Sequence, residues 1–217
     1  MHAPFSDRQD AGRHLAAALQ TYALRSDAIV LGLPRGGVPV AAEVARALDL
    51  PLNLLVVRKI GAPSHAELAI GAVAEGGVHV LESRIISDLL IDTAEVERAT
   101  AVAERELAAY VRRFRAILPF PELRDRQVII VDDGIATGAT IRAAIAAIRA
   151  QQHRAVIVAA PIGSRSTCDG LLADADEVIC WVTPDDFFSV SQGYEDFEPT
   201  TDREVEELLA RQSGARA

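Results

Sequence analysis

The chain has few of the residues that mark disulfide-stapled, zinc-binding or membrane-spanning proteins. Of its 217 residues only two are cysteines, Cys168 and Cys180, and they form no C-x-x-C pair, so a reduced, cytoplasmic protein is expected. The five histidines are scattered without zinc-ligand spacing. Half of the residues are apolar, yet no run approaches the roughly 20 residues that cross a bilayer, and the first residues lack the pattern of a secretory signal. The length suits one well-buried core.

A basic surplus is also missing, since the formal net charge is −9. Non-specific nucleic-acid binding needs basic surface that displaces counterions, so neither a nucleic-acid nor a membrane partner is expected. An anionic ligand would have to meet local cations or arrive with a hard divalent ion such as Mg²⁺. Because Mg²⁺ usually binds through substrate phosphates and waters, the lack of a protein ligand motif does not exclude it.

Short apolar runs rich in β-branched residues alternate with helical segments along most of the chain. Buried strands are predicted at 28–33, 52–57, 128–131, 155–160 and 178–182, and helices at 7–23, 38–48, 94–117, 140–149 and 164–172. Between them, a polar loop at 61–67 precedes a predicted hairpin with strands at 69–74 and 78–81. The alternation predicts an α/β fold with a parallel, doubly wound sheet, whose ligands lie at the carboxyl ends of the strands.

The segment 128–141 carries the clearest chemical signal. An apolar strand is followed by Asp132 and Asp133, and Gly-Ile-Ala-Thr-Gly-Ala-Thr then leads into an Ala-rich helix. Such a turn points N–H groups and the positive end of a helix dipole at one spot, which suits a phosphate; Thr137 and Thr140 add hydroxyl donors, and Gly138 allows close approach. Carboxylates that only accept hydrogen bonds suit a vicinal diol, so the pattern favours a ribose 5-phosphate.

Simpler interpretations of this segment exist, because Asp-Asp-Gly is also an ordinary turn and Thr-Gly-Ala-Thr an ordinary helix start. The missing Lys excludes an ATP-binding P-loop, and no G-x-G-x-x-G fingerprint occurs. With its apolar strand, two acids and Thr-Gly turn, the segment resembles the signature of the type I phosphoribosyltransferase family. The resemblance covers roughly residues 28–183 and is specific only at 128–141.

The resemblance implies one phosphoribosyltransferase domain over residues 1–217. Its parts would be a core at about 28–183, a flexible loop and hairpin at about 59–82, and a small C-terminal hood at about 183–200. It implies an enzyme that transfers the 5-phosphoribosyl group from 5-phosphoribosyl 1-pyrophosphate (PRPP) to a nitrogenous acceptor, with a nucleobase favoured, and releases pyrophosphate. Mg²⁺ held by PRPP and water is the implied cofactor, with no protein metal ligand, and assembly as a homodimer stays open.

The resemblance also implies roles for individual residues. The catalytic residues would be Asp132, Asp133 and Lys59. The phosphate turn would be Ala136, Thr137, Gly138, Ala139 and Thr140. Pyrophosphate would contact Arg35, Gly36 and Gly37 in the loop after the 28–33 strand, and Arg58 at the end of the 52–57 strand. In the family, that loop often carries a cis peptide bond that does not precede proline. The acceptor would contact Phe187, Phe188 and Tyr194.

Several of these roles have alternatives. Arg58 and Lys59 are neighbours, and Lys59 is preferred because alternation along a strand turns only one of them into the cleft. Arg35 could be a surface residue on a simple turn, the aromatic residues could cap the sheet edge, and His65 in the closing loop is interpreted as a solvated histidine in preference to a pyrophosphate contact.

The acid pair has an expected part in the chemistry. A carboxylate about 5 Å from a developing positive charge contributes roughly 3 kcal/mol at an effective dielectric near 20, which would stabilise an oxocarbenium-like ribose.

Two positions depart from the family pattern: Ala136 stands where hypoxanthine-type enzymes have an acid, and Gly134 where an apolar residue is usual. Only Glu195 and Asp196 are candidates for a general base, by position alone. A non-catalytic PRPP-binding regulatory protein and a hydrolase that uses water as acceptor remain alternatives.

Overall fold

A parallel five-stranded sheet lies at the centre of the computed structural model, which describes residues 4–63 and 65–214. Ser64 of the expected loop and both ends of the expected domain therefore lie outside the described residues. The strand order is β2-β1-β6-β7-β8, and every neighbouring pair is parallel. The strands are β1 (Ala28–Gly32), β2 (Leu52–Leu54), β6 (Gln127–Val131), β7 (Ala155–Ile162) and β8 (Glu177–Val182). The prediction of an α/β fold with a parallel sheet is confirmed.

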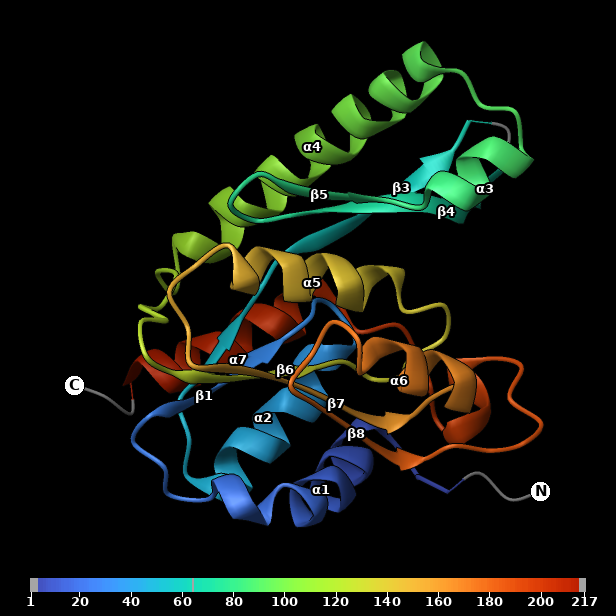
Figure 1. The fold of residues 1–217 in the computed structure, drawn as a ribbon. Coiled ribbons are helices and arrows are strands. Elements are labelled where there is room, and N and C mark those ends of the chain that lie inside the picture. The colour runs from blue at the N-terminus through green and yellow to red at the C-terminus, as the bar shows by residue number, and fades with distance from the viewer. Residues whose placement is uncertain (1–3, 64, 215–217) are drawn as a thin grey trace.

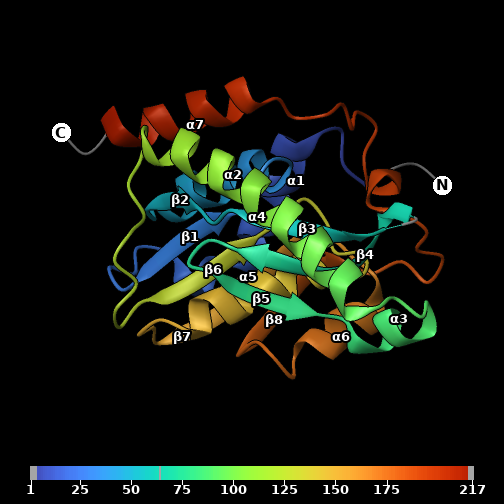
Figure 2. The ribbon, with the colours of Figure 1, turned by 90° about the horizontal axis from the view of Figure 1, so that it is seen from above.

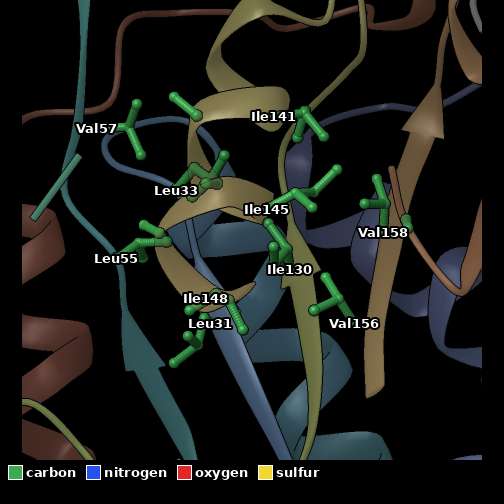
Figure 3. Close-up of a cluster of buried hydrophobic side chains, with 14 of the residues drawn as sticks. Leu31, Leu33, Leu55, Val57, Ile130, Ile141, Ile145, Ile148, Val156 and Val158 are labelled. Atoms are coloured by element: carbon green, nitrogen blue, oxygen red, sulfur yellow. The ribbon is translucent and has the colours of Figure 1, made fainter. Parts of the chain in front are cut away.

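Helices cover both faces of this sheet, as a doubly wound fold requires (Figure 1). One face carries α1 (Arg8–Ala18) and α2 (Gly37–Leu48), and the other carries α5 (Ala139–Arg149) and α6 (Arg165–Leu171). Figure 3 shows apolar side chains of α5 packed between those of β1, β6 and β7. A short 3₁₀ helix, η1 (Gln20–Tyr22), follows α1 in place of the last turns of the helix expected over 7–23.

A second, antiparallel sheet lies on the outer side of α5 (Figure 1), and its strands are β3 (Val57–Ala62), β4 (His65–Ala74) and β5 (Val78–Leu81). The short helix α3 (Ser83–Asp88) leads to α4 (Thr93–Arg115), which covers the other face of this sheet. Buried Ala103, Leu107 and Phe114 form the core-facing stripe of α4, so the predicted amphipathic helix is confirmed.

Two predictions in this region are wrong. The expected strand 52–57 ends early, because β2 stops at Leu54 and the chain leaves the central sheet before β3 begins at Val57. The expected loop 61–67 is largely strand, since β3 continues to Ala62 and β4 begins at His65, with an irregular register around Gly61. Small residues such as Gly61 allow the irregular pairing that carries both strands so far.

A partly buried ion-pair cluster, which we call the Arg115 clamp, joins the two sheets. The guanidinium of Arg115 donates to both carboxylate oxygens of Glu75, each at 2.7 Å. It also donates to the backbone oxygen of Leu54 at 2.8 Å and to the side-chain oxygen of Asn53 at 2.9 Å. Asn53 and Leu54 belong to β2, whereas Glu75 follows β4, so the clamp fixes one end of the antiparallel sheet to the edge of the parallel one.

The C-terminal part returns across the carboxyl edge of the central sheet. After β8 come the 3₁₀ helix η2 (Val190–Gly193) and α7 (Asp202–Gly214). Figure 2 shows α7 running beside α4 and α2, and its Val205 and Leu209 are buried with Val38 of α2 and Leu54 of β2. The segment between β8 and α7 therefore passes next to the loops that follow β1 and β6.

Candidate functional site

A pocket of about 430 Å³ opens where β1 and β6 end. Four segments distant in sequence contribute to it: α1, the loop after β1, the hairpin strand β3, and the loop from β6 to α5, with the C-terminal segment closing one side. Its lining residues are Arg8, Leu33, Pro34, Arg35, Gly36, Lys59, Asp132, Asp133, Gly134, Ile135, Ala136, Thr137, Gly138, Thr140, Ile141, Val190, Phe197, Pro199 and Thr200. The position agrees with the expectation that ligands meet the carboxyl ends of parallel strands.

Two backbone carbonyl groups of the turn between β6 and α5 accept side-chain hydrogen bonds that hold the turn in place. The Thr167 hydroxyl donates to the backbone oxygen of Ala136 at 2.8 Å, and Arg142 donates to that of Thr137 at 3.1 Å. Gly138 caps α5 in the left-handed region, with φ +77°. The first N–H groups of an α-helix lack partners within the helix, so the start of α5 at this pocket offers hydrogen-bond donors suited to an anion. Ala136, Thr137, Gly138 and Thr140 line the pocket, whereas Ala139 lies behind it.

The two acids of the motif are both partly buried at the floor of the pocket. The Asp132 carboxylate accepts a hydrogen bond from the Asp133 amide at 2.9 Å. The Asp133 carboxylate accepts from Nε of Arg8 at 2.8 Å, and its backbone carbonyl accepts from the Tyr194 hydroxyl at 2.5 Å. The pair is therefore held by contacts from both ends of the chain.

Burial dominates the electrostatics of these acids. Desolvation raises the pKa of Asp132 well above its ordinary value, and the neighbouring Asp133 charge raises it further, while Lys59 and Arg8 act in the opposite direction. Desolvation also raises the pKa of Asp133, and the Arg8 guanidinium offsets part of that rise. The nearby cations Arg8, Arg35 and Lys59 give the pocket local positive charge within an acidic protein.

The loop after β1 brings Arg35 and two glycines to the acid pair. The peptide between Pro34 and Arg35 is cis, as the family resemblance implies. A Cβ on Gly36 would lie 1.9 Å from the Asp133 carboxylate, and one on Gly37 would lie 2.7 Å from the carbonyl oxygen of Val131, so the two loops touch through these glycines. Gly36 lines the pocket, whereas Gly37 begins α2 beside it. Arg35 lines the pocket and lies 3.7 Å from Asp202 of α7.

The structure separates the neighbouring Arg58 and Lys59, which both lie within β3 and not at the end of the central strand. Lys59 lines the pocket, whereas the Arg58 guanidinium lies 4.0 Å from the centre of the Tyr110 ring and its Nε 3.9 Å from Glu106, both on α4. Strand alternation explains the difference, as the sequence indicated. His65 begins β4 and is exposed.

The three aromatic residues expected to bind the acceptor lie outside the pocket lining. Phe188 is 88% exposed, Phe187 packs in the small cluster around Phe5, and Tyr194 is buried with its ring stacked on Phe197 at 4.8 Å. Among the described residues, the C-terminal segment presents Val190, Phe197, Pro199 and Thr200 to the pocket instead.

Two observations concern the departures from the family pattern. A Cβ on Gly134 would lie 2.4 Å from a methyl group of Val190, so the glycine allows η2 to settle on the motif. The candidate bases Glu195 and Asp196 do not line the pocket; Asp196 instead accepts from the amide of Glu198 at 3.0 Å.

Sequence reasoning missed Arg8, Val190, Pro199 and Thr200. Arg8 and Asp133 are separated by 125 positions, and no local pattern relates residues so far apart. Phe197 also lines the pocket, and it lies three positions beyond Tyr194, the nearest of the aromatic residues expected at the acceptor.

The fold and the pocket define an α/β protein in which the start of a helix lies next to paired acids at the carboxyl edge of a parallel sheet. A family model described as "Phosphoribosyl transferase domain" matches residues 6–196, and the chain belongs to that family. No helix in residues 4–63 and 65–214 is long and apolar enough to cross a membrane.

Known proteins agree with this assignment. A Mycobacterium tuberculosis protein provisionally named a phosphoribosyl transferase is 46% identical over 210 residues, 95% of this chain but 46% of the relative. The chain thus spans about half the length of that relative. The structure of TT1426 from Thermus thermophilus is 41% identical with a TM-score of 0.81, covering 98% of this chain and 99% of that one. A Neisseria gonorrhoeae protein solved with bound ppGpp shares the fold at 13% identity, with a TM-score of 0.52 and coverage of 98% and 99%.

Proposed function

We propose that this protein is a phosphoribosyltransferase that moves the 5-phosphoribosyl group of PRPP to a nitrogenous acceptor, with a nucleobase favoured, and releases pyrophosphate. One observation carries the proposal: Asp132 and Asp133 share a single pocket with the anion-binding start of α5 and with Arg35 and Lys59. The helix start would hold the 5-phosphate and the carboxylates would accept from the ribose hydroxyls. Arg35 and Lys59 would meet the pyrophosphate.

The same arrangement supports a dissociative displacement at the ribose. As the bond to pyrophosphate breaks, positive charge develops on the ring, and the carboxylates stabilise it, while Arg35 and Lys59 stabilise the departing diphosphate. The acids need not be fully ionised before the donor binds, because the positive charge that forms in the transition state favours their ionised form. Gly36 and the phosphate turn would contribute backbone amides that approach an anion closely, whereas the Gly37 amide already donates to the backbone oxygen of Leu33 at 3.0 Å.

Mg²⁺ is part of the proposal. Within the described part of the chain, no group of three His, Cys, Asp or Glu converges as a metal site. The ion would be held by the phosphates of PRPP and by water, and Asp132 and Asp133 would be left to accept from the ribose hydroxyls. Bound in this way, Mg²⁺ would neutralise charge on the leaving pyrophosphate. A cytoplasmic location belongs to the same proposal and is supported by two free thiols.

A non-catalytic PRPP-binding regulator is the second candidate, and one observation favours it. The pocket residues from the C-terminal segment, namely Val190, Phe197, Pro199 and Thr200, include no ionisable group that could act as a general base. The acceptor side therefore lacks the group that would deprotonate a poor nucleophile.

The test mixes the protein with Mg²⁺, PRPP and a panel of purines, pyrimidines and other amines, and follows pyrophosphate release and PRPP binding. Release that depends on one acceptor is the expected result. Tight PRPP binding without release for any acceptor would establish the regulator instead. Release at the same rate without acceptor would indicate hydrolysis, and no PRPP binding would contradict all three.

A further inference from the structure

One contact in the pocket joins parts of the chain that have no shared motif. Arg8, the first residue of α1, donates from Nε to the Asp133 carboxylate at 2.8 Å and from Nη1 to the backbone oxygen of Glu198 at 2.7 Å. The first bond reaches the acid pair after β6, and the second reaches the segment before α7. A single guanidinium therefore links the amino-terminal helix, the acid pair and the C-terminal segment.

The surroundings of this guanidinium are built to hold it in place. The side chains of Arg8 and Asp133 are 12% and 16% exposed, so solvent screens the pair weakly. The planar guanidinium lies 3.9 Å from the centre of the Phe197 ring, which restricts its rotation. On the other side Gly36 makes room: a Cβ there would lie 1.9 Å from the Asp133 carboxylate and 3.2 Å from Nε of Arg8.

The charged and titratable groups around Asp133 come from several elements. Asp132 is its neighbour in the loop, and Arg8 contacts it from α1. The Tyr194 hydroxyl donates to the backbone carbonyl of Asp133. Lys59 of β3 and Arg35 of the loop after β1 line the same pocket. Arg8 alone among the described residues makes a hydrogen bond to the Asp133 carboxylate. That contact occupies Oδ2 and leaves Oδ1 available to a ligand.

We propose that Arg8 is a positioning residue for Asp133: it orients the carboxylate so that one oxygen accepts a ribose hydroxyl, and it ties this orientation to the docking of residues 197–200. The proposal rests on the proposed function, because the ribose is that of PRPP. Arg8 acts through Asp133 and not through contact with the reacting atoms.

The test compares four proteins by calorimetric titration with Mg²⁺–PRPP in the absence of acceptor: wild type, R8Q, R8K and R13Q. Arg13 is the matched control, because it lies on the same helix, pairs with Asp10 at 3.2 Å, and is half exposed and remote from the pocket lining. A hydrogen bond to a charged group contributes about 1.5–3 kcal/mol, so R8Q should bind PRPP about 10- to 100-fold more weakly. R13Q should bind as wild type does, and R8K should recover part of the loss because it keeps the charge.

A pH series adds a readout that a merely structural role would not change. Without the Arg8 charge the Asp133 carboxyl protonates at higher pH, so in R8Q the acid-side loss of PRPP affinity should move to higher pH, relative to wild type and R13Q. R8Q affinity and pH profile equal to those of R13Q would overturn the proposal, and tighter binding in R8Q would show instead that Arg8 competes with the ribose.

Two further outcomes are distinguishable. If wild type binds no PRPP, the proposed function fails and this inference fails with it; if wild type binds and R8Q is unchanged, only this inference fails. If R8Q loses its cooperative thermal transition, F197L is tested in its place. This variant removes the aromatic ring that stacks on the Arg8 guanidinium and keeps the charge of Arg8. The proposal then requires R8K and F197L both to bind PRPP more tightly than the Asp133→Asn variant, and equal affinities would overturn it.

Discussion

The two walls of the pocket differ in how they are made. One wall, at which we propose that the PRPP donor binds and which we call the donor wall, combines the loop after β1 and the start of α5 with the charged side chains of Arg35, Lys59 and the acid pair. The opposite wall, from the C-terminal segment, offers only Val190, Phe197, Pro199 and Thr200 among the described residues. Under the proposed function, this difference would concentrate electrostatic binding on PRPP, and the acceptor would be selected mainly by shape and by apolar contact.

The largest expected effect is on the donor wall. Asp133→Asn should lower turnover by at least about a hundredfold, because it removes a charge that stabilises the developing cation by roughly 3 kcal/mol. The rate of pyrophosphate release under saturating PRPP measures the loss, and circular dichroism checks that the fold is unchanged. Full activity in a folded variant would contradict the assigned role.

A second change tests whether the loop after β1 and the acid pair really form one wall. Gly36→Ala should push the Asp133 carboxylate out of place, because its Cβ would lie 1.9 Å from that group. We expect PRPP affinity to fall about tenfold or more and stability to fall by about 1–3 kcal/mol. Gly170→Ala is the control, since its Cβ would meet only the far end of Arg142 at 3.7 Å. Equal PRPP affinity and equal stability of the two variants would contradict the close contact between the loop after β1 and the acid pair.

The third change uses the two neighbouring cations of β3. Lys59→Gln should weaken PRPP binding about tenfold, equivalent to about 1.4 kcal/mol, because its ammonium faces the pocket. Arg58→Gln should leave that affinity unchanged and lower stability by about 0.5–1 kcal/mol, through loss of the contact with the Tyr110 ring. Titration calorimetry and chemical denaturation separate the effects, and the reverse result would place Arg58 at the ligand.

The smallest effect concerns stability against pH. The pKa of Asp132 is raised in the folded protein, so the stability linked to it is fully present below the ordinary value of 3.8 and is lost as the pH rises through the raised value. Asp132→Asn removes this penalty. Its unfolding temperature should therefore exceed that of wild type at neutral pH by about 2–4 °C for each kcal/mol gained, and the gap should close near pH 3. A constant gap at all pH values would refute this account.

The sequence pointed to much of the donor wall because its signals are local. Asp132, Thr137 and Gly138 follow one strand within a few residues, and strand alternation predicted that only one of Arg58 and Lys59 enters the cleft. The parallel sheet followed from the same short-range patterns, since each buried strand is a compact apolar run.

The features that sequence analysis missed depend on contacts between segments that are distant in the chain. The continuous apolar run at 52–57 concealed the point where the chain leaves the central sheet, because burial in either sheet demands the same residues. Tyr194 looked like a ligand-stacking residue, but its ring packs against Phe197 and its hydroxyl supports Asp133. The partnership of Arg8 with that acid depends on the whole fold.

The Arg115 clamp anchors the antiparallel sheet near one end. Strand β3 leaves this point at Val57, so Lys59 lies about 7 Å along the strand from it, and Ala62 about 17 Å, at roughly 3.4 Å per residue. Lys59 therefore lies on the part of β3 nearest to the clamp, so the ion pairs that join the two sheets also fix the place at which its ammonium enters the pocket.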